Sequence, residues 1–150
     1  MGTTGDEVLE AVRMTFEQMA FLDVAPGLAA DGIPPARVGP VLFLAYTWPK
    51  TGSFVLFLPK TIRFLVAEGI YSQSWDSLTP GQLDDSLLEL MNVLAGRLLT
   101  QRFGSKTTYS MGLPTVLFDP PEGVPGREHQ DFEYHVDQSG FILVWNEAAE

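Results

Sequence analysis

The sequence contains no cysteine, which excludes disulfide bonds, thiolate zinc sites and cysteine nucleophiles. Its only two histidines, His129 and His135, are too few for a metal site built from histidine alone. Basic residues are also scarce, because 9 Lys and Arg stand against 19 Asp and Glu, which gives a net charge of −10. Nucleic acids and anionic membranes bind basic patches, so small molecules and other proteins are the expected partners.

Long apolar runs are missing as well. No stretch approaches the roughly 20 apolar residues of a membrane helix, and the N-terminus lacks the basic-then-apolar pattern of a signal peptide. We therefore expect a soluble, cytoplasmic protein with no metal site of its own. With 150 residues and a 45% hydrophobic composition, the chain is predicted to form one domain, residues 1–150.

The first half of the chain predicts a helix followed by a β-hairpin. The helix is expected to begin near Thr4, because Thr4 and Glu7 have the spacing of a capping box. Two short apolar runs, 41–48 and 53–58, flank a Pro-Lys-Thr-Gly turn and predict the hairpin. Both runs are almost entirely apolar, which indicates strands covered on both faces, by helices or by a second chain. This pattern favours a homodimer.

The second half predicts two further helices and three strands. A helix over 60–68 is expected to stop at Gly69. The longest helix is expected to begin after Thr79, in a capping box with Gln82, and to end at Gly104. Further strands are expected at about 105–111, 132–136 and 141–145. Helices beside a mainly antiparallel sheet define an α+β fold.

The longest predicted helix carries an unusual polar pair in its middle. At about 100° per residue, Glu89, Asn92 and Gly96 fall together on the side opposite the leucine stripe. Asparagine is a mediocre helix former, and a mid-helix glycine costs about 1 kcal/mol relative to alanine. Most faces of this kind are simply solvated, but the glycine and its apolar neighbours favour a docking surface. The residues expected to bind a partner there are Asp85, Leu88, Val93, Gly96 and Leu99.

The segment "LLELMNVLAG" resembles the E-x-x-N signature of the CheC/CheX/FliY family of bacterial chemotaxis phosphatases, in which a glycine follows four residues after the asparagine. Glu89, Asn92 and Gly96 occupy these three positions. In the same order as in the family, "VRMTFEQMAFLDV" is similar to its first helix, "TGSFVLFLP" to its second strand and "GLPTVLFDP" to the strand after the long helix. CheC-like members carry two E-x-x-N copies. The single copy here is most similar to CheX, which is a homodimer.

The resemblance implies a CheC/CheX-like fold and a phosphatase for the phospho-aspartate of a CheY-like response regulator. Asn92 would orient the attacking water, and Glu89 would anchor the regulator's active-site lysine. The Mg²⁺ of the reaction would belong to the regulator, so no cofactor of the chain's own is expected. Two alternatives stay open: a non-catalytic receiver-binding or flagellar adaptor module of the same fold, and a domain that binds a small ligand on the apolar face of its sheet.

Overall fold

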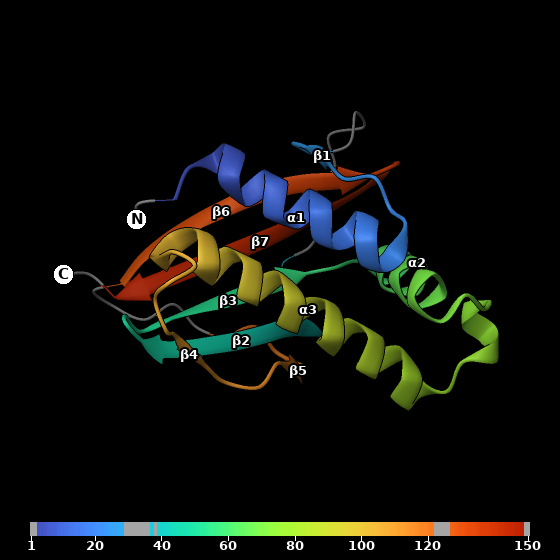
Figure 1. Ribbon diagram of the computed structural model, residues 1–150. Helices are drawn as coiled ribbons and strands as arrows, with labels where there is room; N and C mark the ends of the chain where they lie inside the picture. Colours follow the sequence, from blue (N-terminus) through green and yellow to red (C-terminus); the bar gives the residue numbers. More distant parts are fainter. Residues whose placement is uncertain (1–2, 29–36, 38, 122–126, 149–150) are drawn as a thin grey trace.

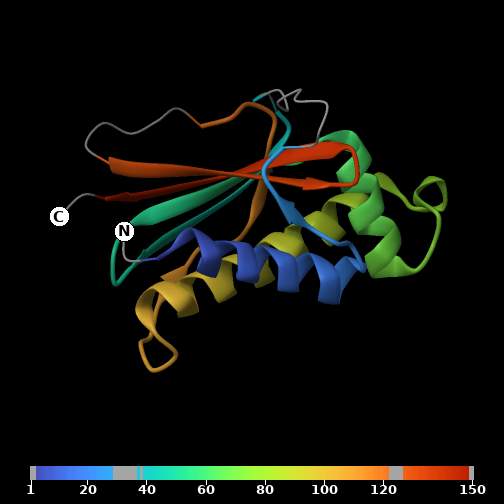
Figure 2. The same ribbon diagram turned by 90° about the horizontal axis from the view of Figure 1, so that it is seen from above.

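Two long α-helices lie against one face of an antiparallel sheet in the computed structural model, and a third helix packs against both of them near one end of the sheet, as Figure 1 and Figure 2 show. The structure describes residues 3–28, 37, 39–121 and 127–148. The helical elements within these residues are α1 (Gly5–Ala20), α2 (Lys60–Tyr71), the 3-10 turn η1 (Trp75–Ser77) and α3 (Pro80–Phe103). The predicted α+β fold class is therefore confirmed.

The sheet formed by the described residues has seven strands, in the order β1-β6-β7-β3-β2-β4, with β5 also paired to β2. The strands are β1 (Ala25–Pro26), β2 (Val41–Trp48), β3 (Gly52–Phe57), β4 (Ser110–Met111), β5 (Thr115–Leu117), β6 (Arg127–Val136) and β7 (Ser139–Ala148). All strand pairs are antiparallel. The hairpin predicted at 41–58 is confirmed as β2 and β3.

Both long helices begin as their sequences predict. At the start of α1, the backbone N–H of Glu7 donates to Thr4 Oγ1 over 3.2 Å, and the Glu7 carboxylate accepts from Thr4 N–H over 3.1 Å. The same reciprocal pair joins Thr79 and Gln82 at the start of α3. Each capping box supplies side-chain acceptors for two backbone N–H groups that have no partner within the helix. Gly104, with φ of 91°, ends α3 as expected.

The prediction that Gly69 stops the second helix is wrong. Helix α2 continues through Gly69 to Tyr71 and ends at Ser72, which has the left-handed φ of 54°. Gly69 serves contact between helices instead, because a Cβ added there would lie 2.2 Å from the carbonyl oxygen of Ala20, at the end of α1. A glycine inside a helix can therefore mark a close approach of two backbones as well as a stop.

The later strands differ from their predicted bounds. In the segment predicted as a strand at 105–111, only Ser110–Met111 pairs with β2, and Thr115–Leu117 forms a second short pairing with the same strand. Strands β6 and β7 each run for 10 residues, well beyond the predicted 132–136 and 141–145. The first half of β6, "REHQD", is polar, so it carries no apolar alternation from which a strand could be predicted.

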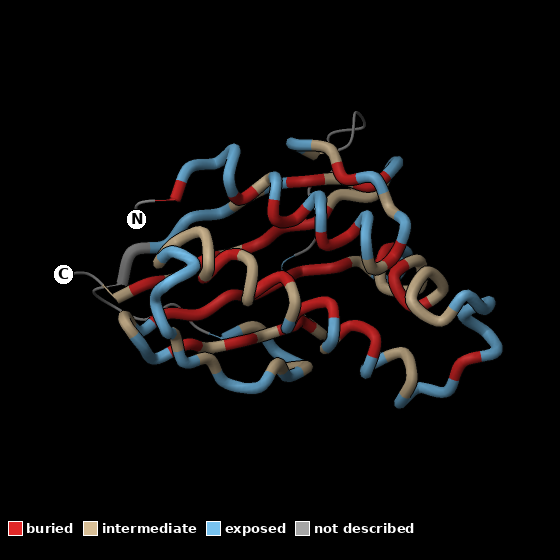
Figure 3. Tube along the Cα trace, viewed as in Figure 1, coloured by how far each residue is buried: buried red, intermediate tan, exposed pale blue. Residues whose placement is uncertain are grey.

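The central strand β3 is buried on both faces, as its apolar sequence predicts. Phe54 and Leu56 belong to the main core between the sheet and the helices. Val55 and Phe57 join a smaller cluster on the other face of the sheet, with Val41, Ile142 and neighbours that are partly buried. Figure 3 shows this burial as red stretches along the central strands. Because a single chain buries β3 on both faces, the strand's apolar sequence does not require a second copy.

Candidate functional site

Helix α3 turns an apolar stripe toward the sheet and the polar pair toward the outside. The predicted apolar stripe has six residues, of which Leu83 is only partly buried. The other five are buried in the main core: Leu87, Leu90, Met91, Leu94 and Leu98. Glu89, Asn92 and Asp85 are all exposed. The orientation predicted for Glu89 and Asn92 is therefore confirmed.

Neither Glu89 nor Asn92 has a role in holding the described part of the chain together. No hydrogen bond or ion pair joins either side chain to another described residue. The two positions are three residues apart, so the carboxylate and the amide are neighbours on the helix surface. Together they present three acceptor oxygens and one amide NH₂ donor group to a molecule that approaches α3 from outside.

Gly96, which completes the signature, is half-buried, although the helix pattern places it on the same face as the exposed Glu89 and Asn92. Its carbonyl oxygen accepts hydrogen bonds from Thr100 Oγ1, at 2.8 Å, and from the Tyr109 hydroxyl, at 3.3 Å. A Cβ added at Gly96 would lie 3.6 Å from the Tyr109 hydroxyl oxygen, which is ordinary van der Waals contact. Alanine therefore fits at this position, and packing within the described chain does not explain the glycine.

An open groove begins one residue beyond Asn92, between α1 and α3, and has a volume of about 410 Å³. Its lining includes Met14 on α1, Val93 and Gly96 on α3, and Tyr109. Neither Met14 nor Tyr109 is among the residues expected to bind a partner. Nothing in the local pattern of either residue marks it, because the groove depends on how α1 and the segment after α3 pack against α3.

The apolar residues expected to border the site lie in different environments. Val93 lines the groove, and Leu88 is partly buried against the core. Leu99 is fully buried, with 0% of its surface exposed, so its expected place on a docking surface is wrong. Tyr109 and Met111 pack against the core cluster that contains Leu99. Near the C-terminal end of α3, the buried part of the helix surface is therefore wider than the leucine stripe alone.

A polar network anchors the last turn of α3 to the sheet. Arg102 forms an ion pair with Glu147 over 3.0 Å, and Glu147 is only 3% exposed. The Tyr46 hydroxyl donates to the same carboxylate over 2.9 Å and accepts from the Trp145 indole N–H over 2.9 Å. Burial raises the pKa of the Tyr46 phenol, so the hydroxyl keeps its proton and remains a donor. The network fixes the helix that carries Glu89 and Asn92.

The two histidines lie apart from α3. His135, on β6, is hydrogen-bonded through Nδ1 to the carbonyl oxygen of Gly27 over 2.9 Å, and His129 is exposed on the same strand. Among the described residues, no group of three His, Asp or Glu side chains could hold a metal ion. No helix in the described part of the chain is long and apolar enough to span a membrane.

These features define a class of protein: an α+β domain whose longest helix displays an E-x-x-N pair on its exposed face. No protein-family model matches the sequence, and no curated protein matches it. The fold, in contrast, matches solved structures over nearly the whole chain.

A CheX chemotaxis protein from Desulfovibrio desulfuricans is similar with a TM-score of 0.73 and 15% identity, over 95% of this chain and 97% of its own. A CheC-like superfamily protein from Shewanella sp. PV-4 gives a TM-score of 0.75 at 14% identity, over 96% of each chain. A structure of the CheX–CheY–BeF3–Mg²⁺ complex from Borrelia burgdorferi gives 0.73 at 14% identity, over 96% of this chain and 97% of the matched chain. The chain has the CheC/CheX fold, and the fold that the sequence resemblance implies is confirmed.

Proposed function

We propose that this protein binds a CheY-like receiver domain and accelerates hydrolysis of its phospho-aspartate. The observation that carries the proposal is the exposed Glu89–Asn92 pair on α3, which has no role in holding the described chain together. A neighbour of the same fold has been solved in complex with CheY, BeF3 and Mg²⁺, which supports a receiver domain as the partner class. Receiver domains of this kind are cytoplasmic, so the proposal includes a cytoplasmic location.

In this proposal Asn92 orients the attacking water. An aspartyl phosphate is an activated acyl phosphate, so its hydrolysis depends mainly on positioning and charge stabilisation. A side-chain amide suits that task, because its carbonyl accepts a hydrogen bond from water while its NH₂ group donates to a phosphoryl oxygen. Asn92 is exposed and can therefore enter the active site of a partner.

Glu89 acts as the anchor of the complex. Its carboxylate pairs with the lysine of the receiver's active site and thereby fixes the position of Asn92, one turn away, against the phosphoryl group. The Mg²⁺ that neutralises the phosphoryl oxygens belongs to the receiver, and this chain contributes no cofactor. Docking depends on this local pair, because a net charge of −10 does not steer the chain toward an acidic partner.

The proposal also includes a two-fold homodimer with the α3 helices facing outward. Its support is apolar surface near β4, where Trp48, at the end of β2, is 60% exposed and Leu113, between β4 and β5, is 85% exposed. Large apolar side chains exposed close together often mark a contact with another chain. Light scattering should give twice the chain mass at micromolar concentration, and a monomer mass would remove this part of the proposal.

The direct test is phosphate release from phosphorylated receiver domains, measured with and without the protein. We expect the wild type to accelerate release and Asn92→Ala to lose that acceleration. Gln138→Ala is the matched control, because Gln138 is an exposed amide in the β6–β7 turn, remote from α3. If the wild type binds the receiver and leaves its dephosphorylation rate unchanged, the protein is a non-catalytic adaptor of the same fold.

A further inference from the structure

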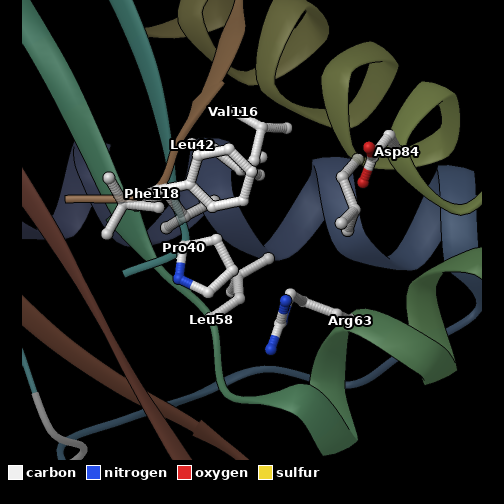
Figure 4. Close-up of a pocket in the computed structure, with 10 residues that line it drawn as sticks. Pro40, Leu42, Leu58, Arg63, Asp84, Val116 and Phe118 are labelled. Carbon is white, nitrogen blue, oxygen red and sulfur yellow. The ribbon is translucent and has the colours of Figure 1, made fainter. Parts of the chain in front are cut away.

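A second pocket lies away from Glu89 and Asn92, where α2 and the start of α3 meet strands β2, β3 and β5. Its volume is about 320 Å³. The apolar part of its lining includes Leu58, Leu87, Val116 and Phe118. Figure 4 shows Arg63 reaching from α2 toward this space, with Asp84 of α3 at another side.

Arg63 brings a guanidinium group to the lining of the pocket. Its Nε is buried and has no hydrogen-bond partner, which is uncommon for a buried nitrogen in a folded protein. No ion pair joins the Arg63 guanidinium to a described residue, although Asp84 lines the same pocket. Because the guanidinium lines the pocket without an ion pair to a described residue, a carboxylate in the pocket can accept charge-assisted hydrogen bonds from its N–H groups.

We propose that this pocket binds a small carboxylate with an apolar chain. The carboxylate accepts from Arg63, and the chain lies against the leucine, valine and phenylalanine side chains. At roughly 30 Å³ for each water-sized group, the volume holds roughly ten non-hydrogen atoms. A straight-chain acid such as octanoate has this size. The proposal concerns a site separate from the E-x-x-N pair and does not depend on the phosphatase function.

Asp84 is an acidic residue in the same lining, and its charge opposes anion binding. Its side chain is exposed, so water screens its charge, whereas the Nε of Arg63 is buried. The cation therefore dominates inside the pocket and the acid weakens anion binding only modestly. Replacing Asp84 with asparagine should tighten carboxylate binding by up to about fivefold, the range expected for a screened surface charge.

Octanoate titration of the full chain, followed by amide chemical shifts, tests the proposal. A ligand of this size should bind with a Kd on the order of 0.1 to 1 mM and shift the amides of Leu58, Leu87 and Val116. Octan-1-ol, which has the same chain and no charge, should bind at least about tenfold more weakly, because it lacks the charge-assisted hydrogen bond. Equal affinities for the two probes, or no shifts well above the expected Kd, would overturn the proposal.

Two variants localise the binding. Arg63→Gln removes the cation and should weaken octanoate binding about tenfold or more, while Lys60→Gln, a cation one turn earlier on α2 outside the pocket lining, should leave it unchanged. Val116→Phe should fill the pocket and abolish binding. Its control is Thr115→Phe, on the adjacent position of β5, which is exposed and does not line the pocket. Octanoate binding that survives Arg63→Gln unchanged contradicts the assignment.

Discussion

Polar side chains at the C-terminal end and in the middle of helix α3 lie in opposite environments. Near its C-terminal end, Arg102 is tied to the buried carboxylate of Glu147. In the middle, Glu89 and Asn92 are exposed and make no hydrogen bond or ion pair with the described residues. One end of the helix therefore holds the fold together, and the middle is available to a partner. Mutations at the two places should separate stability from function.

The largest effect is expected from Glu147→Ala. Arg102 is only 16% exposed, so the mutation leaves a nearly buried cation and the Tyr46 hydroxyl without their acceptor. Breaking such a pair lowers the free energy of unfolding by about 3 kcal/mol or more. Urea unfolding measures the change, and Glu133→Ala, at an exposed position of β6, is the control. A loss below about 0.5 kcal/mol, typical of surface sites, would show that the network does not anchor α3.

Asn92→Ala should have the second-largest effect. It should lower the dephosphorylation rate and leave stability unchanged. If the amide orients water in the transition state, dephosphorylation falls about 100-fold or more, which corresponds to about 3 kcal/mol. Affinity for a receiver loaded with beryllium fluoride, a phosphoryl mimic, should hardly change. The urea midpoint should also stay at the wild-type value, because the side chain is exposed. Wild-type turnover in this variant would mean that the chemistry has been assigned to the wrong residue.

Changes at Glu89 should affect binding together with turnover. Glu89→Ala removes the proposed partner of the receiver's lysine, so affinity and rate should fall together, by about tenfold or more. Glu89→Lys should be worse, since it places two positive charges against each other. Calorimetric titration against the loaded receiver gives the affinity, and phosphate release gives the rate. A variant with a slower rate and unchanged affinity would place Glu89 in the chemical step and not in the anchor.

The smallest effect is expected at Gly96, where stability and function should move in opposite directions. Alanine fits at this position, so Gly96→Ala should raise the free energy of unfolding by about 0.5 to 1 kcal/mol. If the partner approaches this face closely, the added methyl group should weaken receiver binding. Gly69→Ala is the contrasting variant and should be strongly destabilising, because its Cβ would overlap the backbone of Ala20. Unchanged receiver binding in Gly96→Ala would remove the close-approach role.

The sequence predicted those features of the fold that depend on residues close together in the chain. The capping boxes at Thr4 and Thr79 gave the starts of both long helices, and the 3.6-residue period gave the direction in which Glu89 and Asn92 point. A short motif with its flanking segments was enough to predict the CheC/CheX fold, although overall identity to the neighbours is only about 15%.

Features that depend on contacts between distant segments could not be predicted in this way. Leu99 is buried in a core cluster against which the chain after α3 also packs, and Gly69 lies where two helices meet. The Arg102–Glu147 pair joins residues of α3 and β7, and the pocket at Arg63 needs three strands and two helices in place. The residues next to them in the sequence give no indication of these contacts.

The position of β3 also bears on how the chain folds during synthesis. β3 lies between β2, its neighbour in sequence, and β7, the last strand of the described chain, and Gly52 pairs with Glu147. The apolar strand therefore leaves the ribosome long before its second partner exists. Contacts of such large sequence separation slow folding, and an unpaired apolar strand can associate with other chains in the interval. A nascent chain stalled before β7 should consequently bind chaperones.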